Sequence, residues 1–298
     1  MLPNAQIDMF AITAYDPPLR DNRDVMEYPF LSIQKGRTRP INYSNKDGSV
    51  QLEITGSDYG IATIWDWDLM IYLTAHINDA LENNQPVSQW VEFAPHDALR
   101  YMGKSNGGKD YQELVKSLRR LATTNIITSL RKDDVSGTER IIRWFTDYEI
   151  PKKYSINKFV REEGLAEADP SKPWRVKLPD WIFKSILRRT EILAVHPQYF
   201  KLTGGLERWL YRLARKAVPD NADFPVIKFK METLHERSGS TRPLRKFAHD
   251  IRNLAEKNKL PEYNITVKKQ NRTEYVFLMR DKNKPRRMPR DVQALIEK

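Results

Sequence analysis

Two stretches of the chain, 133 residues apart, carry the same helical spacing of apolar side chains. In the stretch from about 109 to 122 these side chains are Tyr111, Leu114, Val115, Leu118, Leu121 and Ala122. In the stretch from about 242 to 257 they are Leu244, Phe247, Ala248, Ile251, Leu254 and Ala255. Intervals of three and four place each set on one face of a helix that packs against a core. Both stretches are therefore predicted to be amphipathic helices, in equivalent places of two similar units.

The surroundings of the two helices indicate the kind of unit. Each helix is preceded by a shorter predicted helix and a turn, at 95–108 and 231–240. Each is followed by two strand-like runs, 126–131 and 140–145 in the first unit and 263–268 and 274–279 in the second. Helix, turn, helix and hairpin is the order of a winged-helix domain. Any two helices that pack on a core share an apolar stripe, but a hairpin after both of them favours a repeat.

The fold class predicted from these patterns is α+β. It consists of two tandem winged-helix domains, related by a weak internal repeat and preceded by a short N-terminal β segment. Alternating residues between 28 and 55, with a turn at Lys46-Asp47-Gly48, predict the strands of that segment. The predicted parts are a flexible tail (1–27), an N-terminal winged-helix domain with leading strands (28–150), a linker (151–173), a C-terminal winged-helix domain (174–280) and a basic tail (281–298).

The charge of the chain is unevenly divided between its two halves. Residues 1–150 contain 16 basic and 21 acidic side chains, a net −5, whereas residues 151–298 contain 34 and 18, a net +16. A basic surplus of this kind is typical of proteins that bind a polyanion, most often nucleic acid. Because affinity for a polyanion follows the number of neutralised phosphates, the C-terminal half is predicted to supply most of it.

Basic side chains lie off the apolar face of the helix at 242–257: Arg242, Arg245, Lys246, His249 and Arg252. A helix fits the major groove, where arginine donates two hydrogen bonds to guanine. The hairpin after the helix adds Lys268, Lys269 and Arg272, which are predicted to contact phosphate or the minor groove. A solvated basic face is the alternative for the helix alone, and the glycine-serine turn before it and the cations of the hairpin favour DNA binding.

The earlier helix is less basic, and its role is more open. It offers Lys109, Lys116, Arg119 and Arg120, which share the helix with Asp110 and Glu113. This mixed surface is predicted to bind DNA weakly, or to serve as a dimer or partner surface.

No pattern in the sequence indicates catalysis, and we expect neither an enzyme nor a metal or other cofactor. The chain has no cysteine, which excludes disulfides and thiolate metal sites. Its five histidines include no His-x-His pair and no HExxH motif. Gly107-Gly108-Lys109 is followed by Asp110, where a phosphate-binding P-loop requires Ser or Thr. Asp66 and Asp68 lie two apart on a helix and face different directions, which is a poor arrangement for holding a metal.

The chain is expected to be cytoplasmic, associated with plasmid or nucleoid DNA. Its first 25 residues lack a charged start followed by an apolar core, so they do not resemble a signal peptide. No stretch reaches about 18 consecutive apolar residues, so no contact with a membrane is expected.

Several longer stretches resemble a known family. They are GIATIWDWDLMIYLTA (60–75), GGKDYQELVKSLRRLATTNI (107–126), LPDWIFKSIL (178–187), YFKLTGGLERWLYRLARKA (199–217), LHERSGS (234–240) and NKLPEYNI (258–265). In this order and spacing they look like the replication initiator protein A family of bacterial plasmids. The resemblance runs from about Tyr28 to Met279.

The resemblance implies a plasmid replication initiator, similar in design to the iteron-binding initiators with two winged-helix domains. Its implied partners are repeated double-stranded origin DNA, a second copy of the chain, and the host initiator and replicative helicase. Repression of its own gene and opening of the origin are implied roles, and no catalytic residue is implied. The rival readings are a winged-helix transcriptional regulator without a replication role, and an enzyme of replication such as a nickase or primase.

Overall fold

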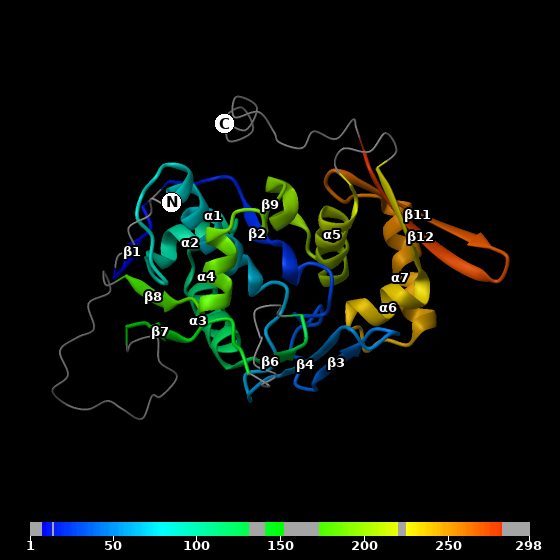
Figure 1. Cartoon of the computed structure of the whole chain (residues 1–298), viewed down its shortest axis with the longest axis horizontal. Coiled ribbons are helices and arrows are strands. Elements are labelled where there is room, and N and C mark those ends of the chain that lie inside the picture. The colour runs from blue at the N-terminus through cyan, green and yellow to red at the C-terminus, as the bar shows by residue number, and fades with distance from the viewer. Residues whose placement is uncertain (1–7, 14, 131–140, 152–172, 220–224, 282–298) are drawn as a thin grey trace.

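The computed structural model describes residues 8–13, 15–130, 141–151, 173–219 and 225–281, and it has the expected α+β composition (Figure 1). Six elements of the N-terminal half occur in the order helix, strand, helix, helix, strand and strand, with one further strand, β6 (Asn125–Thr128), between the fourth and the fifth. They are α1 (Trp67–Glu82), β5 (Trp90–Phe93), α2 (Pro95–Tyr101), α3 (Gly108–Thr123), β7 (Asp147–Glu149) and β8 (Trp174–Lys177). The three strands pair antiparallel in the order β5-β8-β7.

Six elements of the C-terminal half repeat this order. They are α5 (Gly205–Ala217), β10 (Val226–Lys230), α6 (Met231–Ser238), α7 (Leu244–Lys257), β11 (Tyr263–Gln270) and β12 (Thr273–Arg280). Their strands pair antiparallel in the order β10-β12-β11, so in both sets the last strand lies between the first two. The two sets thus share an order of elements, apart from β6, and a pattern of strand pairing. In the first set the strand pair after α3 is β7 with β8, not the two runs predicted from the sequence.

The segment before α1, called the leading segment below, is integrated into the fold. Its described residues up to 27 include paired strands and buried side chains, whereas a flexible tail was predicted for 1–27. Its elements are β1 (Phe10–Ala11), β2 (Arg20–Asn22), the 3-10 helix η1 (Arg23–Val25), β3 (Ile41–Ser44) and β4 (Gln51–Thr55). β1 pairs parallel with β5, and β2 pairs antiparallel with β9 (Ile192–Ala194). Leu19, Val25 and Met26 are buried, and this apolar area holds the segment in place. Residues 1–7 and 14 lie outside the described residues.

The hairpin expected after α3 does not form as predicted. The first run contains β6 (Asn125–Thr128), but β6 pairs with β4, which gives a sheet in the order β3-β4-β6. The second run pairs with β6 at a single bridge among the described residues, between Ile126 and Ile142, and Arg143 donates a side-chain hydrogen bond to Asn125 at 3.0 Å. Trp144 and Phe145 turn inward instead, both fully buried. Burial of two large aromatic side chains outweighs the few ladder hydrogen bonds that a second strand would add. Residues 131–140 lie outside the described part.

The sequence suggested that Trp174–Lys177 begins the C-terminal set of elements, but in the structure it belongs to the N-terminal set. Its partners are β5 and β7, so it completes the sheet of the N-terminal set. Residues 152–172, which make up nearly all of the predicted linker, are outside the described residues. After β8 the chain continues through α4 (Asp180–Leu187), β9 and the 3-10 helix η3 (Pro197–Lys201) into α5.

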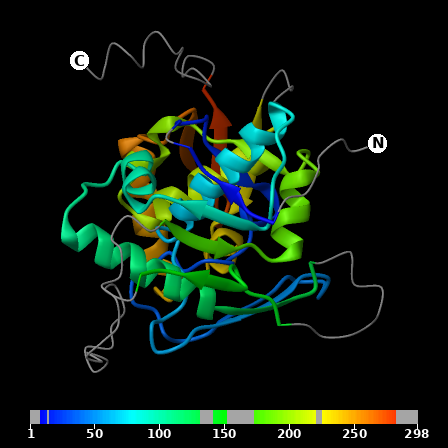
Figure 2. The same ribbon diagram turned by 90° about the vertical axis from the view of Figure 1, so that its left-hand side faces the viewer.

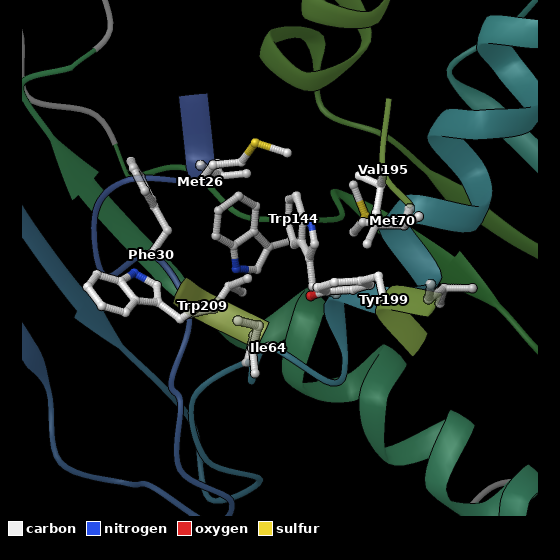
Figure 3. Close-up of a cluster of buried hydrophobic side chains, with 14 of the residues drawn as sticks. Met26, Phe30, Ile64, Met70, Trp144, Val195, Tyr199 and Trp209 are labelled. Carbon is white, nitrogen blue, oxygen red and sulfur yellow. The ribbon is translucent and has the colours of Figure 1, made fainter. Parts of the chain in front are cut away.

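One hydrophobic core connects both sets of elements. Figure 3 shows a part of it around Trp144, with Met26 and Phe30 from the leading segment and Trp209 from α5. The ring of Trp144 lies 4.7 Å from that of Trp67 in an edge-to-face arrangement. Because α5 shares this core with α1 and with the leading segment, the two sets are packed together and are not separated by a linker.

Candidate nucleic-acid interface

The helix α7 turns its apolar face toward its own sheet and α6. Phe247, Ala248 and Ile251 are buried on that face, and the ring of Phe247 lies 5.0 Å from that of His235 on α6. The turn before the helix is made by Gly239, whose φ of +63° favours glycine. The helix ends at Asn258, which also has a left-handed backbone conformation. The apolar spacing therefore predicted the buried face from Phe247 onward, whereas Leu244, assigned to the same face, is exposed at the start of the helix.

The five basic residues predicted on α7 line a single open groove of about 660 Å³: Arg242, Arg245, Lys246, His249 and Arg252. All five are exposed. Arg242 forms an ion pair with Asp250 at 3.1 Å, whereas Arg245 and Lys246 have no ion-pair partner in the described part of the chain. Two cations that the protein does not neutralise, on one turn of an exposed helix, are available to an external anion.

The hairpin of β11 and β12 extends past α7 and presents the other predicted cations (Figure 1). Lys268, Lys269 and Arg272 are exposed at its end, where Gln270 pairs with Thr273 across a two-residue connection. Arg252 of α7 donates two hydrogen bonds to Glu274 of β12, at 2.7 and 3.1 Å. This ion pair joins the helix to the hairpin, so the two groups of cations hold a defined relative position.

The four cations predicted on α3 do not form one surface. Lys109 and Lys116 are exposed, and Lys116 pairs with Glu113 at 2.7 Å. Arg119 is buried, only 6% exposed, with its guanidinium 5.4 Å from the ring of Tyr59. Arg120 donates two hydrogen bonds to Asp66, at 2.7 and 2.8 Å. The prediction that Arg119 and Arg120 project from α3 is therefore wrong, because both are engaged inside the fold.

The side of α3 that faces the leading segment lines a cleft of about 430 Å³. Its charged residues include Lys35, Asp66, Lys104, Asp110, Glu113, Lys116 and Arg120. Ser105 donates a hydrogen bond to Asp110, and Asp66 accepts from Ser117 at 2.6 Å as well as from Arg120. Two ion pairs form here, Arg120 with Asp66 and Lys116 with Glu113. Carboxylates are thus mixed with the cations of this cleft, whereas the α7 groove is lined by basic residues alone.

A loop that sequence reasoning missed borders the N-terminal end of the α7 groove. It comprises Gln34–Pro40 of the leading segment, and Thr241 donates a hydrogen bond to Gln34 at 2.8 Å. Its sequence, QKGRTRP, holds three cations within seven residues. This local density of cations is visible in the sequence. The sequence does not show that Gln34 lies beside Thr241, which follows it by 207 positions.

The carboxylates Asp66 and Asp68 do face different directions. Asp66 accepts from Arg120 of α3, and Asp68 accepts from Arg208 of α5 at 2.5 Å. Among the described residues, no group of three or more His, Asp or Glu side chains is placed to hold a metal ion. Within the same residues, no helix is both long enough and apolar enough to cross a membrane.

The chain belongs to the replication initiator protein A family, whose sequence model matches residues 20–265. It is 31% identical over 245 residues to a protein of Wigglesworthia glossinidia brevipalpis that is named for an inferred role in replication. The aligned region covers 80% of this chain and 82% of that protein.

The fold is similar to crystal structures of domains 2 and 3 of RctB. One matches with a TM-score of 0.55 and 16% identity, over 84% of this chain and 94% of that one. Another matches with a TM-score of 0.52 and 15% identity, over 90% and 98%.

Proposed function

We propose that this replication initiator binds repeated origin DNA of a plasmid through two winged-helix domains and acts without catalysis of its own. The α7 groove supports this proposal most directly. Four basic side chains of the exposed helix, together with Arg242 from the turn before it, gather there beside the cations of the β11–β12 hairpin. The width of a helix matches the major groove, and a projecting hairpin can contact the flanking backbone.

The two winged-helix domains correspond to the two sets of repeated elements. Their order, helix, strand, helix, helix and a strand pair, supports this assignment, as does the equal strand pairing in both sets. We place the boundary after Lys177, because β8 pairs only with strands of the first set.

The two domains have different roles in this proposal. The α7 domain reads the sequence, and the α3 domain, whose recognition-helix position mixes cations with carboxylates, binds DNA weakly or contacts another protein. A second copy of the chain, the host initiator and the replicative helicase are the partners we propose for it, with origin opening as the outcome of assembly and repression of its own gene as a second role.

Binding is tested with full-length protein and a DNA fragment carrying the direct repeats beside its gene. Neutralising about 6–8 phosphates lowers affinity by about three to four orders of magnitude between about 50 and 200 mM salt. Replacing Arg245 with Ala costs about 1–3 kcal/mol and relaxes the preference at one base pair. Replacing Lys269 with Ala weakens binding to all sequences alike. Specific binding that survives Arg245→Ala would show that α7 is not the reading helix.

Replication is tested separately from binding. A plasmid that carries only this gene and its flanking DNA should replicate in a suitable host. Repression without replication would favour the transcriptional regulator. Supercoiled origin DNA incubated with the protein, magnesium and nucleotides should yield neither nicks nor primers, and finding either would establish an enzyme.

A further inference from the structure

The loop Gln34–Pro40, which we call the leading loop, is bound to the turn that precedes α7. Thr241 donates to Gln34, and Arg37 donates through Nη1 to the carbonyl oxygen of Gly239 at 2.5 Å. Packing adds to these bonds, because a Cβ atom on Gly239 would lie 2.7 Å from Pro29 Cβ and 3.4 Å from Ile41 Cγ2. The loop therefore has a fixed position at the N-terminal end of the α7 groove, although it comes from the other end of the chain.

Arg37 also sets the shape of the leading loop. Its Nε donates to the carbonyl oxygen of Arg39 at 2.9 Å, and its Nη2 donates to that of Pro40 at 2.8 Å. Gly36 has a φ of +69°, which allows the tight turn between Lys35 and Arg37. All three acceptors of Arg37 are neutral carbonyl groups, so the bonds order the loop without removing its positive charge.

The other two cations of the leading loop face solvent. Lys35 and Arg39 are exposed. Lys35 Nζ lies 5.0 Å from the ring centre of Trp65, and the Arg39 side chain has neither a hydrogen bond nor an ion pair in the described part of the chain. No described carboxylate pairs with Lys35, Arg37 or Arg39. Lys35 also lines the cleft beside α3, where no described carboxylate pairs with it. The loop thus adds unneutralised charge beside the turn that precedes α7.

The place of the loop decides which part of DNA it can reach. A helix that inserts its N-terminal residues into the major groove has phosphates on either side of that end. Exposed lysine and arginine beside the helix start meet this backbone and not base edges. Arginine can also bind a phosphate with two parallel hydrogen bonds.

We propose that the leading loop contacts the DNA phosphate backbone at the N-terminal end of α7 through Lys35 and Arg39, with Arg37 as the positioning residue. This inference rests on the proposed function. It makes the reading site composite, since helix and hairpin come from the C-terminal set of elements and the loop from the segment before α1.

The test replaces the two exposed cations in the full-length protein with glutamine, as Lys35→Gln with Arg39→Gln. Each lost phosphate contact lowers the steepness of log affinity against log salt by about 0.9. At 0.1 M salt this change corresponds to about an eightfold loss of affinity. The double variant should lose up to about 60-fold at 0.1 M salt, equally for repeat DNA and unrelated DNA. Phosphate-ethylation interference on repeat DNA should lose one patch of signals at one end of the site.

The matched control is Lys184→Gln with Arg188→Gln. These residues are also exposed, but they are paired, Lys184 with Asp180 at 3.9 Å and Arg188 with Glu191 at 3.1 Å. They lie on α4 and at its C-terminal cap, next to the C-terminal end of α1, where Arg189 bonds the Leu81 carbonyl. The control should bind like the wild type.

The outcomes separate the two proposals. An unchanged salt slope in the loop variant, together with lost specificity in Arg245→Ala, would overturn the loop contact and leave the α7 reading site standing. Specific binding intact in Arg245→Ala would overturn the placement of the reading site on α7, on which the loop contact rests. A thermal melt identical to that of the wild type confirms that the loop variant is folded, as expected for two exposed side chains. Replacing Arg37 with Lys should restore part of the slope lost in Arg37→Ala, because lysine keeps the charge and one of the three bonds.

Discussion

His76 illustrates how one buried side chain makes the stability of this fold depend on pH. It lies on α1 at 6% exposure, with the rings of Tyr72 and Tyr101 at 4.5 and 5.7 Å. Its Nε2 has no hydrogen-bond partner among the described residues. Burial among these rings lowers the pKa of His76 from 6.5 to about 3, because the charged imidazolium would lose its hydration.

The sign of the pH effect follows from this lowered pKa. Between pH 6.5 and about 3 the unfolded chain binds a proton that the folded chain rejects, so stability present above pH 6.5 is lost as the pH falls. The loss is about 1.4 kcal/mol for each pH unit. Urea unfolding at pH 7 and pH 5 should show a smaller drop in His76→Leu than in the wild type. Equal drops in both proteins would mean that His76 is hydrated or paired in the folded state.

At the scale of elements, a buried ion pair joins α1 to α5. Asp68 and Arg208 are each 1% exposed, and Arg208 also donates to the carbonyl oxygens of Leu202 and Phe200 at 2.6 and 3.2 Å. One turn further along α5, Arg212 bonds Asp21 of β2 at 2.7 Å, and Asp21 also accepts from Trp67. Arg208 and Arg212 thus connect α5 to α1 of the first set and to β2 of the leading segment.

Removing one partner of this pair leaves a buried charge alone. Asp68→Ala should lower the free energy of unfolding by about 3–5 kcal/mol. The control Glu113→Ala breaks an exposed pair with Lys116 and should change it by about 0–1 kcal/mol. Denaturant titration of the three proteins measures both differences. Similar small losses in both variants would show that Arg208 finds another partner or reaches water.

At the scale of the whole molecule, the shared core predicts how the protein unfolds. Trp209 of α5 packs with residues of the leading segment and of α1 in one continuous cluster. Neither set of elements can separate without exposing that cluster to water.

Calorimetry should therefore show one unfolding transition, with equal calorimetric and van't Hoff enthalpies. A fragment that starts at residue 178 should not fold alone, since α5 would expose Trp209, Arg208 and Arg212. Two separate transitions, or a folded fragment, would indicate independent domains instead.

Local patterns predicted which basic side chains around α7 are exposed and lie together, because helical spacing depends on neighbours a turn away. Phe247 and Ile251 fix the buried face, and the five groove residues follow from geometry. The same reasoning failed for Arg119 and Arg120, since their places depend on Tyr59 and Asp66, which lie in other elements. A helical pattern predicts the direction in which a side chain points, but not which residues of other elements it contacts there.

Long-range pairing was the other limit of the sequence. Trp144 could be read as part of a strand, and only the packed structure shows that its ring completes a core shared by several segments. The leading loop is the same case in the candidate site. Its charges are visible in the sequence, whereas its contact with Gly239 depends on tertiary packing.

The bond between Asp21 and Arg212 also bears on how the chain is made. These residues are 191 positions apart, so at about 5–20 residues per second a ribosome needs about 10–40 s to supply the second after the first. During that interval β2 lacks β9, and Asp21 lacks the arginine that balances its charge. The N-terminal half of each new molecule therefore lacks these partners during most of the time that translation of the chain takes. Synonymous codons that slow the ribosome between these residues should lengthen the exposure of the nascent chain to proteases and chaperones.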